Sequence, residues 1–437
     1  METVKTDVVV VGSGPGGAAV ARKMAAAGRS VCILEWGSDN APTPGRFSSP
    51  LRYFGGVGLM RHAIMKTATR PVMNMVRGLG TGGSTMMYAG VCEEPQLEKF
   101  TAYGIELAEE IRAIKSAITI QPLVDAQLGE KAWLLAQSAR ALGLPWKNSD
   151  RFFVDPVRFR QGSVFMGDKS GSRWDARRWI LESVDRGAVL MNGVFCERAL
   201  LKGNRAIGVE AVRRTGQQLR VEADTVVLAA GGIGSPQILR QSGVPEAGRT
   251  LCNDPYMLAF GYLDKKLSGL PEANRQGCVS LDGVLTVADA CVPGMVYLQM
   301  LKKSRLPGRL FAGRQALALL FEIADDSTGF LDAEGRVHKT LTEADQQKLA
   351  RGKEVTREIL LRAGARDIWF SSVSAVHPAG TCRIGDIVDS NLKTRIDGLY
   401  VADASVLPEG LGVPPVLSIL ALGGRLARHL LTEGGHT

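Results

Sequence analysis

The feature that most constrains the fold is a glycine loop set between a strand-like run and a helical pattern. Asp7–Val11 is β-branched and apolar, and the loop after it places Gly12, Gly14 and Gly17 in the spacing GxGxxG. In such a βαβ unit the first glycine permits the turn, the second admits backbone N–H groups to a pyrophosphate, and the third lets helix and strand pack closely. The pattern predicts a bound dinucleotide whose ribose hydroxyls bond to Glu35, at the end of the next strand, and an acid there disfavours NADP.

The length and composition predict a globular chain of two domains. The 437 residues are 45% hydrophobic and 22% charged, which is enough to bury a large core. No apolar run reaches the roughly 18 residues of a membrane span, and the residues before Asp7 lack a secretory pattern, so a cytoplasmic protein is expected. The seven cysteines stand singly, without a CxxC pair or a metal-ligand spacing with histidine, so neither disulfides nor a bound metal are expected.

A formal net charge of +9 raises the question of an acidic partner. Solvated surface charge is one interpretation. Two basic stretches that are also rich in apolar residues, Leu51–Arg77 and Leu301–Arg314, indicate peripheral contact with a membrane, at its inner face for a cytoplasmic protein. Nucleic acid is not expected as a partner, because the basic residues are not interleaved with aromatic residues or set in a known reading motif.

Four further segments that contain glycine follow one another along the chain. Arg77–Thr85 reads RGLGTGGST, Val227–Val244 contains SPQILRQSG, His377–Gly385 reads HPAGTCRIG and Gly398–Pro408 reads GLYVADASVLP. In this order they resemble the second glycine-rich segment, the internal signature, the catalytic-histidine motif and the closing segment of the glucose-methanol-choline (GMC) oxidoreductases. The resemblance implies an enzyme that uses FAD and removes hydrogen from a CH–OH donor.

The resemblance also implies an α/β fold, in which a Rossmann-like FAD-binding domain carries an inserted α+β substrate-binding domain. The FAD-binding domain is expected to be discontinuous, formed by residues 1–95, 189–260 and 375–437, and the substrate-binding domain by residues 96–188 and 261–374. The local patterns predict strands at Val189–Met191, Val209–Val212, Val221–Ala229 and Gly398–Ala402, a glycine-rich turn at Gly231–Gly234, and helices at Ala18–Ala27, Thr342–Arg362 and Val416–Leu431.

Site residues follow from the same resemblance. His377 is expected beside the flavin, where it assists removal of the hydroxyl proton while hydride passes to flavin N5. The start of the final helix is expected to direct its positive end at the flavin ring. The expected contacts with FAD, besides the glycine loop and Glu35, are Pro15, Gly82, Gly83, Ser84, Cys196, Ala230, Asp403, Pro415 and Val416.

Two positions depart from the family pattern. Pro414 occupies the place of the asparagine or second histidine before the final helix, and a proline side chain cannot help to hold a substrate hydroxyl. Met87 and Tyr88 stand where relatives carry an asparagine or a histidine that bonds covalently to the flavin, so noncovalent FAD is expected. Tyr88 is a candidate for the missing hydrogen bond to substrate, and a buried aromatic ring beside the flavin is the alternative interpretation.

Three functions remain open on these residues. The first is oxidation of a small organic alcohol, hydrophobic in view of the Met-rich stretches, by a dehydrogenase whose electron acceptor is a quinone or a carrier protein. The second keeps FAD but dehydrogenates or reduces a carbon–carbon bond, which needs no polar partner at Pro414. The third is an electron-transfer or binding subunit without alcohol chemistry, and the presence of His377 argues against it.

Overall fold

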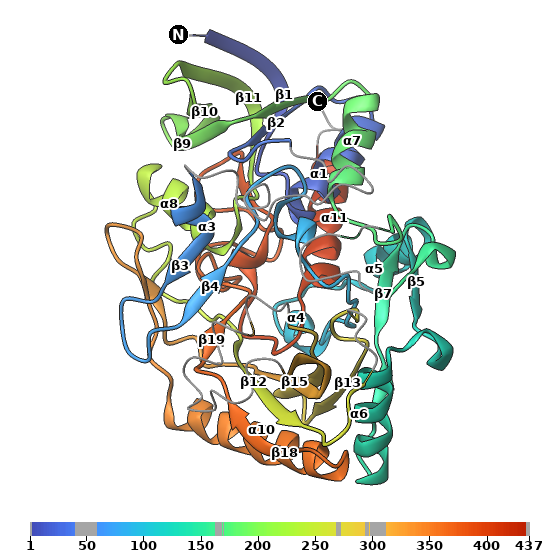
Figure 1. Cartoon of the computed structure of the whole chain (residues 1–437). Helices are drawn as coiled ribbons and strands as arrows, with labels where there is room; N and C mark the ends of the chain where they lie inside the picture. Colours follow the sequence, from blue (N-terminus) through green and yellow to red (C-terminus); the bar gives the residue numbers. More distant parts are fainter. Residues whose placement is uncertain are drawn as a thin grey trace.

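The structure of the protein is a computed structural model, which describes residues 2–39, 59–161, 168, 170–267, 272–292, 297 and 312–433. Figure 1 shows one sheet at the upper end of the molecule and a second sheet at the lower end, with the final helix α11 (Val416–Glu433) between them and beside the upper sheet. Segments from the beginning, the middle and the end of the chain meet in both halves, so the chain crosses between the sheets several times.

The upper sheet is built around the predicted βαβ unit. Its strands are β1 (Glu2–Val11), β2 (Val31–Glu35), β8 (Val189–Asn192), β9 (Val194–Lys202), β10 (Arg205–Arg213), β11 (Gln218–Leu228) and β20 (Leu399–Val401). Their order is β8-β2-β1-β11-β10-β9, with β20 alongside β11. β1 pairs in parallel with β2 and β11, and Val8–Val11 are all buried, as is typical of a central parallel strand covered on both faces.

Helices from several parts of the chain share one apolar core with this sheet. They are α1 (Pro15–Ala26), α5 (Ala108–Ala117), α7 (Arg177–Asp185), α8 (Gly231–Gln241) and α11. α1 begins at Pro15, before the predicted start at Ala18, because proline at the first helical position has a suitable φ and needs no partner for an N–H group. The prediction of a turn at Gly231–Gly234 is wrong, since these residues form the first turn of α8, which follows β11 after two residues.

The first and last helices of the chain pack closely. A Cβ atom at Gly423 of α11 would lie 2.7 Å from the carbonyl oxygen of Gly16 in α1, and a Cβ at Gly16 would lie 1.8 Å from the carbonyl oxygen of Ala402. Both positions therefore require glycine. The contact at Gly423 holds α11 against α1, although the two helices are separated by almost the entire chain, and the contact at Gly16 holds α1 against the residue that follows β20.

Among the described residues, the lower sheet has nine strands. They are β3 (Ile64–Lys66), β4 (Asn74–Val76), β6 (Lys147–Asn148), β12 (Pro255–Tyr262), β13 (Gly277–Leu281), β14 (Leu285–Asp289), β15 (Ala316–Ile323), β18 (Arg366–Phe370) and β19 (Ser374–Ala375). The order is β3-β4-β19-β12-β15-β14-β13-β6, and β18 pairs with β12. The predicted helix α10 (Glu343–Arg362) lies along the lower edge in Figure 1 and packs on β15, where Gly352 admits the Phe321 ring; a Cβ there would lie 2.3 Å from it.

Sheet membership crosses the boundaries expected for the two domains. β3, β4 and β12 belong to the lower sheet, although residues 1–95 and 189–260 were assigned to the FAD-binding domain. Conversely, α5 and α7 contribute Ile111 and Ile180 to the core of the upper sheet. Partners far away in sequence decide such packing, so local patterns do not reveal it. The division into two domains stays a proposal.

Further helices and two pairs of short strands lie outside the two large sheets. They are α3 (Met60–Ala63), α4 (Glu98–Thr101), α6 (Glu130–Ala141) and the paired strands β5 (Thr119–Pro122) with β7 (Asp150–Phe153) and β16 (Phe330–Leu331) with β17 (Val337–His338). α6 carries Leu135 and Ala136 into the same core as α10. The predicted helical character between residues 96 and 144 is therefore confirmed for three helices, with a strand between the second and the third.

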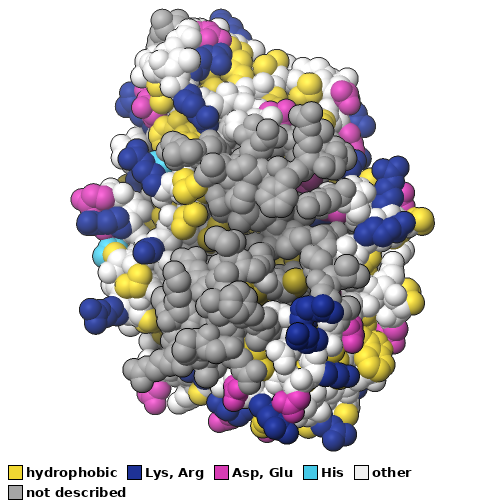
Figure 2. Space-filling view, viewed as in Figure 1, with side chains coloured by type: hydrophobic (Ala, Val, Ile, Leu, Met, Phe, Trp, Pro, Cys, Tyr) yellow, Lys and Arg dark blue, Asp and Glu magenta, His cyan; other side chains and the backbone are white. Residues whose placement is uncertain are grey.

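The basic stretches predicted to touch a membrane lie partly outside the described residues, which exclude 51–58 of the first stretch and 301–311 of the second. In the part of the chain that the structure describes, no helix combines the length and the apolar character needed to cross a bilayer. On the face drawn in Figure 2, Lys and Arg side chains are spread around the rim with Asp and Glu among them. Peripheral membrane contact stays a prediction.

Candidate active site

A cavity of about 1000 Å³ is lined by residues from both sheets. The glycine loop and the starts of α8 and α11 line it on one side, and Tyr256, Leu258, Leu320 and Glu322 line it on the other. These four residues alternate along β12 and β15 with residues that pack into the core beneath α10, so one face of the lower sheet forms the wall. The cavity can therefore hold a cofactor against the upper sheet and a second molecule against the lower one.

The glycines of the first loop have different surroundings. Gly12 has a φ of 107°, and a Cβ there would lie 2.2 Å from the carbonyl oxygen of Ala229, just after β11. A Cβ at Gly17 would lie 2.2 Å from the carbonyl oxygen of Gly12, so this glycine lets α1 pack onto the loop. At Gly14 a Cβ would meet no atom of the described residues within 4 Å, and the residue lines the cavity. Gly14 is followed by Pro15 and the first turn of α1. The N–H groups of a first helical turn have no partner within the helix, so a phosphate binds well there.

Glu35 is buried at the end of β2 and lines the same cavity. Its Oε2 atom accepts hydrogen bonds from the N–H group of Ser13 at 3.2 Å and from the Ser13 hydroxyl at 2.5 Å, and its Oε1 atom accepts one from the N–H group of Gly37 at 2.7 Å. Burial raises the pKa of this carboxyl, and the hydrogen bonds oppose that rise. Glu35 thus fixes the glycine loop to the end of β2, while its contact with a ribose stays a prediction.

The second glycine-rich segment lies directly against the first. Gly82 and Gly83 have φ values of 99° and 56°, and a Cβ at Gly83 would lie 2.8 Å from the Cα atom of Gly14. Gly83 and Ser84 line the cavity, and the Ser84 hydroxyl accepts a hydrogen bond from the N–H group of Gly78 at 3.1 Å. Gly82 does not line it; a Cβ there would lie 2.9 Å from the backbone nitrogen of Arg177. The two loops therefore form one continuous wall.

Asp403 connects the closing segment to the start of α8. Its Oδ2 atom accepts hydrogen bonds from the N–H group of Gly231 at 2.8 Å and from the Ser235 hydroxyl at 2.5 Å, and its Oδ1 atom accepts one from the N–H group of Ser405 at 2.7 Å. The Ser235 hydroxyl in turn accepts a bond from the N–H group of Ala230 at 3.0 Å. Burial raises the pKa of Asp403 and these bonds oppose the rise. Ala230 and Asp403 both line the cavity.

The start of α11 also borders the cavity. Pro414, Pro415 and Val416 line it, and the Pro415 carbonyl accepts the N–H group of Ile419 at 3.0 Å, which places Pro415 at the entry to the helix. The first N–H groups of a helix have no partner within the helix, so this end offers positive partial charge to the cavity. Cys196 of β9 lines the cavity as well, and burial raises the pKa of its thiol.

His377 lines the cavity from the loop that follows β19. Its Nδ1 atom lies 3.0 Å from Oδ2 of Asp254, and 27% of its side chain is exposed. The residue has a φ of 50°, a left-handed conformation that is uncommon for histidine and is often found at functional sites. The next residue packs on the start of α8, because a Cβ at Gly232 would lie 1.9 Å from the carbonyl oxygen of Pro378.

Tyr88 also reaches the cavity, but its hydroxyl has a partner. The phenol donates a hydrogen bond to the backbone carbonyl of Trp174 at 2.6 Å, and the Arg173 guanidinium lies 5.1 Å from the centre of the ring. Burial raises the pKa of Tyr88. The only proton of the hydroxyl is therefore used within the protein, and Tyr88 can offer a substrate an acceptor oxygen and an apolar ring. Its catalytic role stays a prediction.

Comparison with known proteins identifies the family. Models of the GMC oxidoreductases match residues 16–256 and 273–423. This chain belongs to the GMC oxidoreductase family. A GMC-type oxidoreductase of Mycobacterium tuberculosis, itself uncharacterised, is 28% identical in an alignment 475 positions long. The alignment covers 96% of this chain and 74% of the relative. A long-chain-alcohol oxidase of Arabidopsis thaliana is 24% identical in an alignment 529 positions long, which covers 99% of this chain and 69% of the relative.

Solved structures confirm the fold of this GMC oxidoreductase. Pyridoxine 4-oxidase from Mesorbium loti has a TM-score of 0.76 at 20% identity, over 98% of this chain and 99% of that one. A formate oxidase variant from Aspergillus oryzae has a TM-score of 0.77 at 14% identity, over 100% and 99%. The predicted Rossmann-like FAD-binding fold is thus confirmed. The protein is an FAD-dependent oxidoreductase that acts on a small organic substrate.

The cavity walls of this GMC oxidoreductase fit FAD. Gly14, with open space beside its backbone, and the starts of α1, α8 and α11 line the cavity, and such groups suit the pyrophosphate and the ring of FAD. Their contacts with individual parts of FAD stay predictions. Gly17 and Gly82 serve packing and do not line the cavity. The other predicted contacts line it, namely Gly12, Gly14, Pro15, Glu35, Gly83, Ser84, Cys196, Ala230, Asp403, Pro415 and Val416.

Several charged residues near His377 were not predicted from the sequence. Besides Asp254, they include Arg275, whose Nη1 atom donates to Oε1 of Glu322 at 2.7 Å in a buried ion pair. Burial raises the pKa of Glu322, and the charges of Arg275 and His377 oppose that rise. All of these groups come from the lower sheet or its borders, where the sequence carries no glycine motif. The only available signal was that acids and an arginine stand inside apolar strand patterns.

Proposed function

We propose that this GMC oxidoreductase oxidises an alcohol, and that His377 accepts the proton of the substrate hydroxyl. Bound FAD supplies the acceptor for the hydride that leaves the carbinol carbon. The observation that carries the proposal is the position of His377, whose side chain lines the cavity shared by the FAD-binding loops and the lower sheet. Because Asp254 engages Nδ1, the other ring nitrogen, Nε2, is left to take a proton from the substrate.

The wall opposite the FAD-binding loops supports a hydrophobic substrate. Leu258, Leu320, Ala290 and Val292 line this part of the cavity and belong to one apolar cluster with Phe260. Each CH₂ group buried on such a surface contributes about 0.8 kcal/mol to binding. The alcohol is therefore one with an apolar chain or ring, whose hydroxyl lies at His377. The name of the Arabidopsis relative, a long-chain-alcohol oxidase, agrees with this class.

The proposed electron acceptor is a quinone or a carrier protein, which makes the enzyme a dehydrogenase. Its support is the basic, apolar-rich stretch Leu51–Arg77, which suits docking to an acidic or membrane-bound partner. The two structural relatives named above and the Arabidopsis relative are called oxidases, so oxygen is the alternative acceptor. Oxygen consumption and reduction of a soluble quinone, measured on the same preparation with the same alcohol, distinguish the two.

The experiment that tests the alcohol reaction is anaerobic reduction of the bound flavin. Aliphatic, aromatic and polycyclic alcohols are added to the holoenzyme, and the loss of the flavin absorption band is followed. We expect bleaching by an apolar alcohol and a decrease of about 100-fold or more in its rate for His377→Gln, since a general base typically contributes 10²–10⁴-fold. His429→Gln, in the last turns of α11, is the matched control. Equal rates for the parent and His377→Gln would refute the assignment.

Carbon–carbon chemistry is the second candidate, and Pro414 is the observation that favours it. This residue lines the cavity and presents no hydrogen-bonding group to a substrate hydroxyl. If the lost hydrogen bond limits alcohol oxidation, Pro414→Asn raises the turnover of the best alcohol. If no alcohol bleaches the flavin of either protein, but a saturated or unsaturated ketone changes its redox state, the second candidate replaces the first.

A further inference from the structure

One carboxylate joins His377 to the loop that precedes the final helix. Asp254 stands between Asn253 and β12, and its Oδ2 atom lies 3.0 Å from Nδ1 of His377. Its Oδ1 atom accepts a hydrogen bond from the N–H group of Gly412 at 3.0 Å. Only 4% of the Asp254 side chain is exposed. Asp254 thus holds two segments of the cavity wall that are distant from it in sequence.

The backbone on both sides of this contact is unusual. Asp254 has a φ of 36° and His377 has a φ of 50°, so both residues adopt left-handed conformations. Gly412, whose N–H group donates to Asp254, has a φ of 64°. The N–H group of Val376 donates to the Asn253 carbonyl at 3.0 Å, which holds the two chain segments side by side. Such conformations persist only where the surroundings enforce them, and they occur preferentially at active sites.

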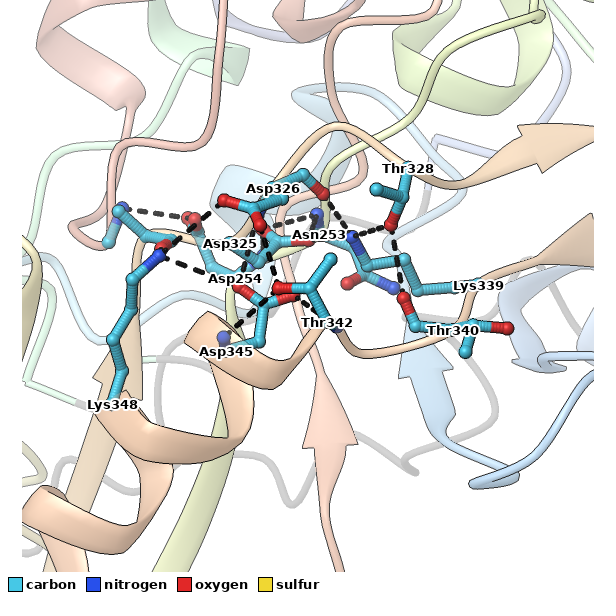
Figure 3. Close-up of polar contacts among 12 residues, drawn as sticks. Asn253, Asp254, Asp325, Asp326, Thr328, Lys339, Thr340, Thr342, Asp345 and Lys348 are labelled. Atoms are coloured by element: carbon cyan, nitrogen blue, oxygen red, sulfur yellow. Dashed lines mark hydrogen bonds and ion pairs between the residues drawn. The ribbon is translucent and has the colours of Figure 1, made fainter.

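A second buried carboxylate, that of Asp325, binds the backbone at Asp254. Oδ1 of Asp325 accepts hydrogen bonds from the N–H groups of Asn253 and Asp254, both at 3.0 Å. Asp325 also pairs with Lys339 at 2.6 Å, and neither side chain is exposed at all. Figure 3 shows these residues in one connected set of polar contacts, with Asp254 and Asp325 adjacent and Lys339 beside them. The network fixes the backbone that carries Asp254.

The proton on the imidazole follows from these acceptors. A carboxylate oxygen can only accept, so Nδ1 of a neutral His377 must carry the proton that it donates to Asp254. Nε2 then has a free lone pair. Among the described residues, Glu322 and its partner Arg275 also carry charge near this pair, and they neutralise one another across 2.7 Å. The charges of Asp325 and Lys339 are likewise paired with each other. Asp254 is therefore the group that decides which ring nitrogen is protonated.

We propose that Asp254 is a positioning residue that keeps His377 in the tautomer whose Nε2 atom accepts the substrate proton. This inference rests on the proposed function. It concerns only residues of this chain and requires no covalent step. The proton moves from the substrate hydroxyl to Nε2, and the resulting imidazolium is stabilised by the Asp254 carboxylate.

The tautomer can be measured directly on the oxidised holoenzyme. The chain contains five histidines, so ¹⁵N-labelling of histidine and long-range proton–nitrogen correlation give a resolvable set of rings, and His377→Gln assigns the ring of interest. We expect His377 to carry its proton on Nδ1, opposite to the form that free imidazole side chains prefer. A proton on Nε2 in the neutral parent enzyme overturns the proposal without any variant of Asp254.

The variant Asp254→Asn tests the consequence. The N–H group of Gly412 needs an acceptor, so the amide oxygen faces Gly412 and the amide NH₂ faces Nδ1 of His377. The amide then donates to Nδ1, and the ring proton moves to Nε2. We expect flavin reduction at pH 7 to slow by about 100-fold or more, given that the corresponding change in Ser-His-Asp triads costs about 10⁴-fold. The rate should recover in part as pH rises, while the flavin content stays that of the parent.

The control variant is Asp264→Asn, which removes an acidic charge from a side chain that is 76% exposed just beyond the other end of β12. It should leave rate, pH profile and tautomer unchanged. An Asp254→Asn enzyme with the parent rate and pH profile refutes the positioning role, and the alcohol function survives if His377→Gln is still impaired. If His377→Gln also reacts at the parent rate, the proposed function itself fails.

Discussion

The Oδ2 atom of Asp403 lies 2.5 Å from the hydroxyl oxygen of Ser235, 168 positions away in the chain. The same oxygen accepts the N–H group of Gly231, and Oδ1 accepts that of Ser405, so a single carboxylate holds the start of α8 against the closing segment. Both segments line the FAD cavity. Loss of this carboxylate should therefore affect stability and FAD binding together.

We predict that Asp403→Ala lowers the free energy of unfolding by about 2–4 kcal/mol, because it leaves several buried donors without an acceptor. Its affinity for FAD should also fall, since the start of α8 is no longer fixed. Ser235→Ala removes one of these donors and should cost about 1 kcal/mol. Thermal melts of the apoprotein and FAD titration by quenching of flavin fluorescence measure the two effects. Parent-like values for Asp403→Ala would contradict the structure.

Gly14 and Gly16 should respond differently to the addition of one methyl group. At Gly14 a Cβ meets no described atom within 4 Å, so Gly14→Ala should leave the apoprotein stable but weaken FAD binding by at least about 10-fold, or about 1.4 kcal/mol. At Gly16 a Cβ would lie 1.8 Å from the Ala402 carbonyl oxygen, so Gly16→Ala should destabilise the apoprotein by about 1–3 kcal/mol or more.

The same two measurements, an apoprotein melt and an FAD titration, test both variants. The prediction concerns the contrast between them. Gly14→Ala should lose affinity for FAD without losing stability, whereas Gly16→Ala should first of all lose stability. If Gly14→Ala binds FAD as tightly as the parent, the open face of the loop is not the pyrophosphate site. A Gly16→Ala protein that melts at the parent temperature would show that α1 can move away from the backbone of Ala402 without cost.

The glycine loop could be predicted because its pattern is local. Gly12 and Gly14 lie in the turn between β1 and α1, Gly17 lies in the first turn of α1, and Glu35 ends the strand that follows, so spacing alone places them. His377 was found in the same way, by a motif of consecutive residues. Each of these positions is determined by neighbours within about thirty residues of sequence, a range over which βαβ geometry is regular.

Asp254 could not be predicted in this way. It lies 123 positions from His377, beside Pro255 and without a repeating pattern around it, and it reaches the histidine only because β12 pairs with β19. Strands such as β3 and β4, of three residues each, are too short to show a period, and their place in the lower sheet is decided by pairing with β19 almost 300 residues later. Long-range pairing is therefore what the sequence patterns did not reveal.

The buried pair of Asp325 and Lys339 should be costly to break. Both side chains are fully buried and lie 2.6 Å apart, so Lys339→Met leaves an uncompensated carboxylate beneath Asp254. We predict a loss of about 3–5 kcal/mol in the free energy of unfolding. The control is Lys5→Met, which breaks a pair with Glu222 in which the lysine side chain is 82% exposed, and it should change stability little.

Urea denaturation of the two variants measures this difference. The single variant Asp325→Asn and the double variant Lys339→Met with Asp325→Asn complete a cycle, and the double variant should recover part of the loss seen in Lys339→Met because no unpaired charge remains. Similar stabilities for Lys339→Met and Lys5→Met would mean that the buried pair does not form as described.

The last prediction concerns pH and the loop that holds Arg173. Burial would raise the pKa of Asp168, but hydrogen bonds from the hydroxyls of Ser170 and Ser172 and from the backbone N–H groups of Ser170 and Arg173 lower it to about 2. An unfolded aspartate has a pKa of about 3.9. The unfolded state therefore binds this proton first as the solution is acidified. The stabilising contribution is complete above about pH 5 and is lost as pH falls from there to about 2.

Asp168→Asn should accordingly lower the free energy of unfolding at pH 7 by about 1–2 kcal/mol, less than the full value of the pKa shift because the side chain is partly exposed. The difference from the parent should shrink below pH 4 and be nearly absent at pH 2, which urea denaturation at several pH values measures. Arg173 donates to the carbonyl of Met86 at 2.8 Å, next to the segment that carries Tyr88 into the cavity, so FAD retention should follow the same pH dependence. A constant difference across this pH range would show that Asp168 acts through shape alone and not through its charge.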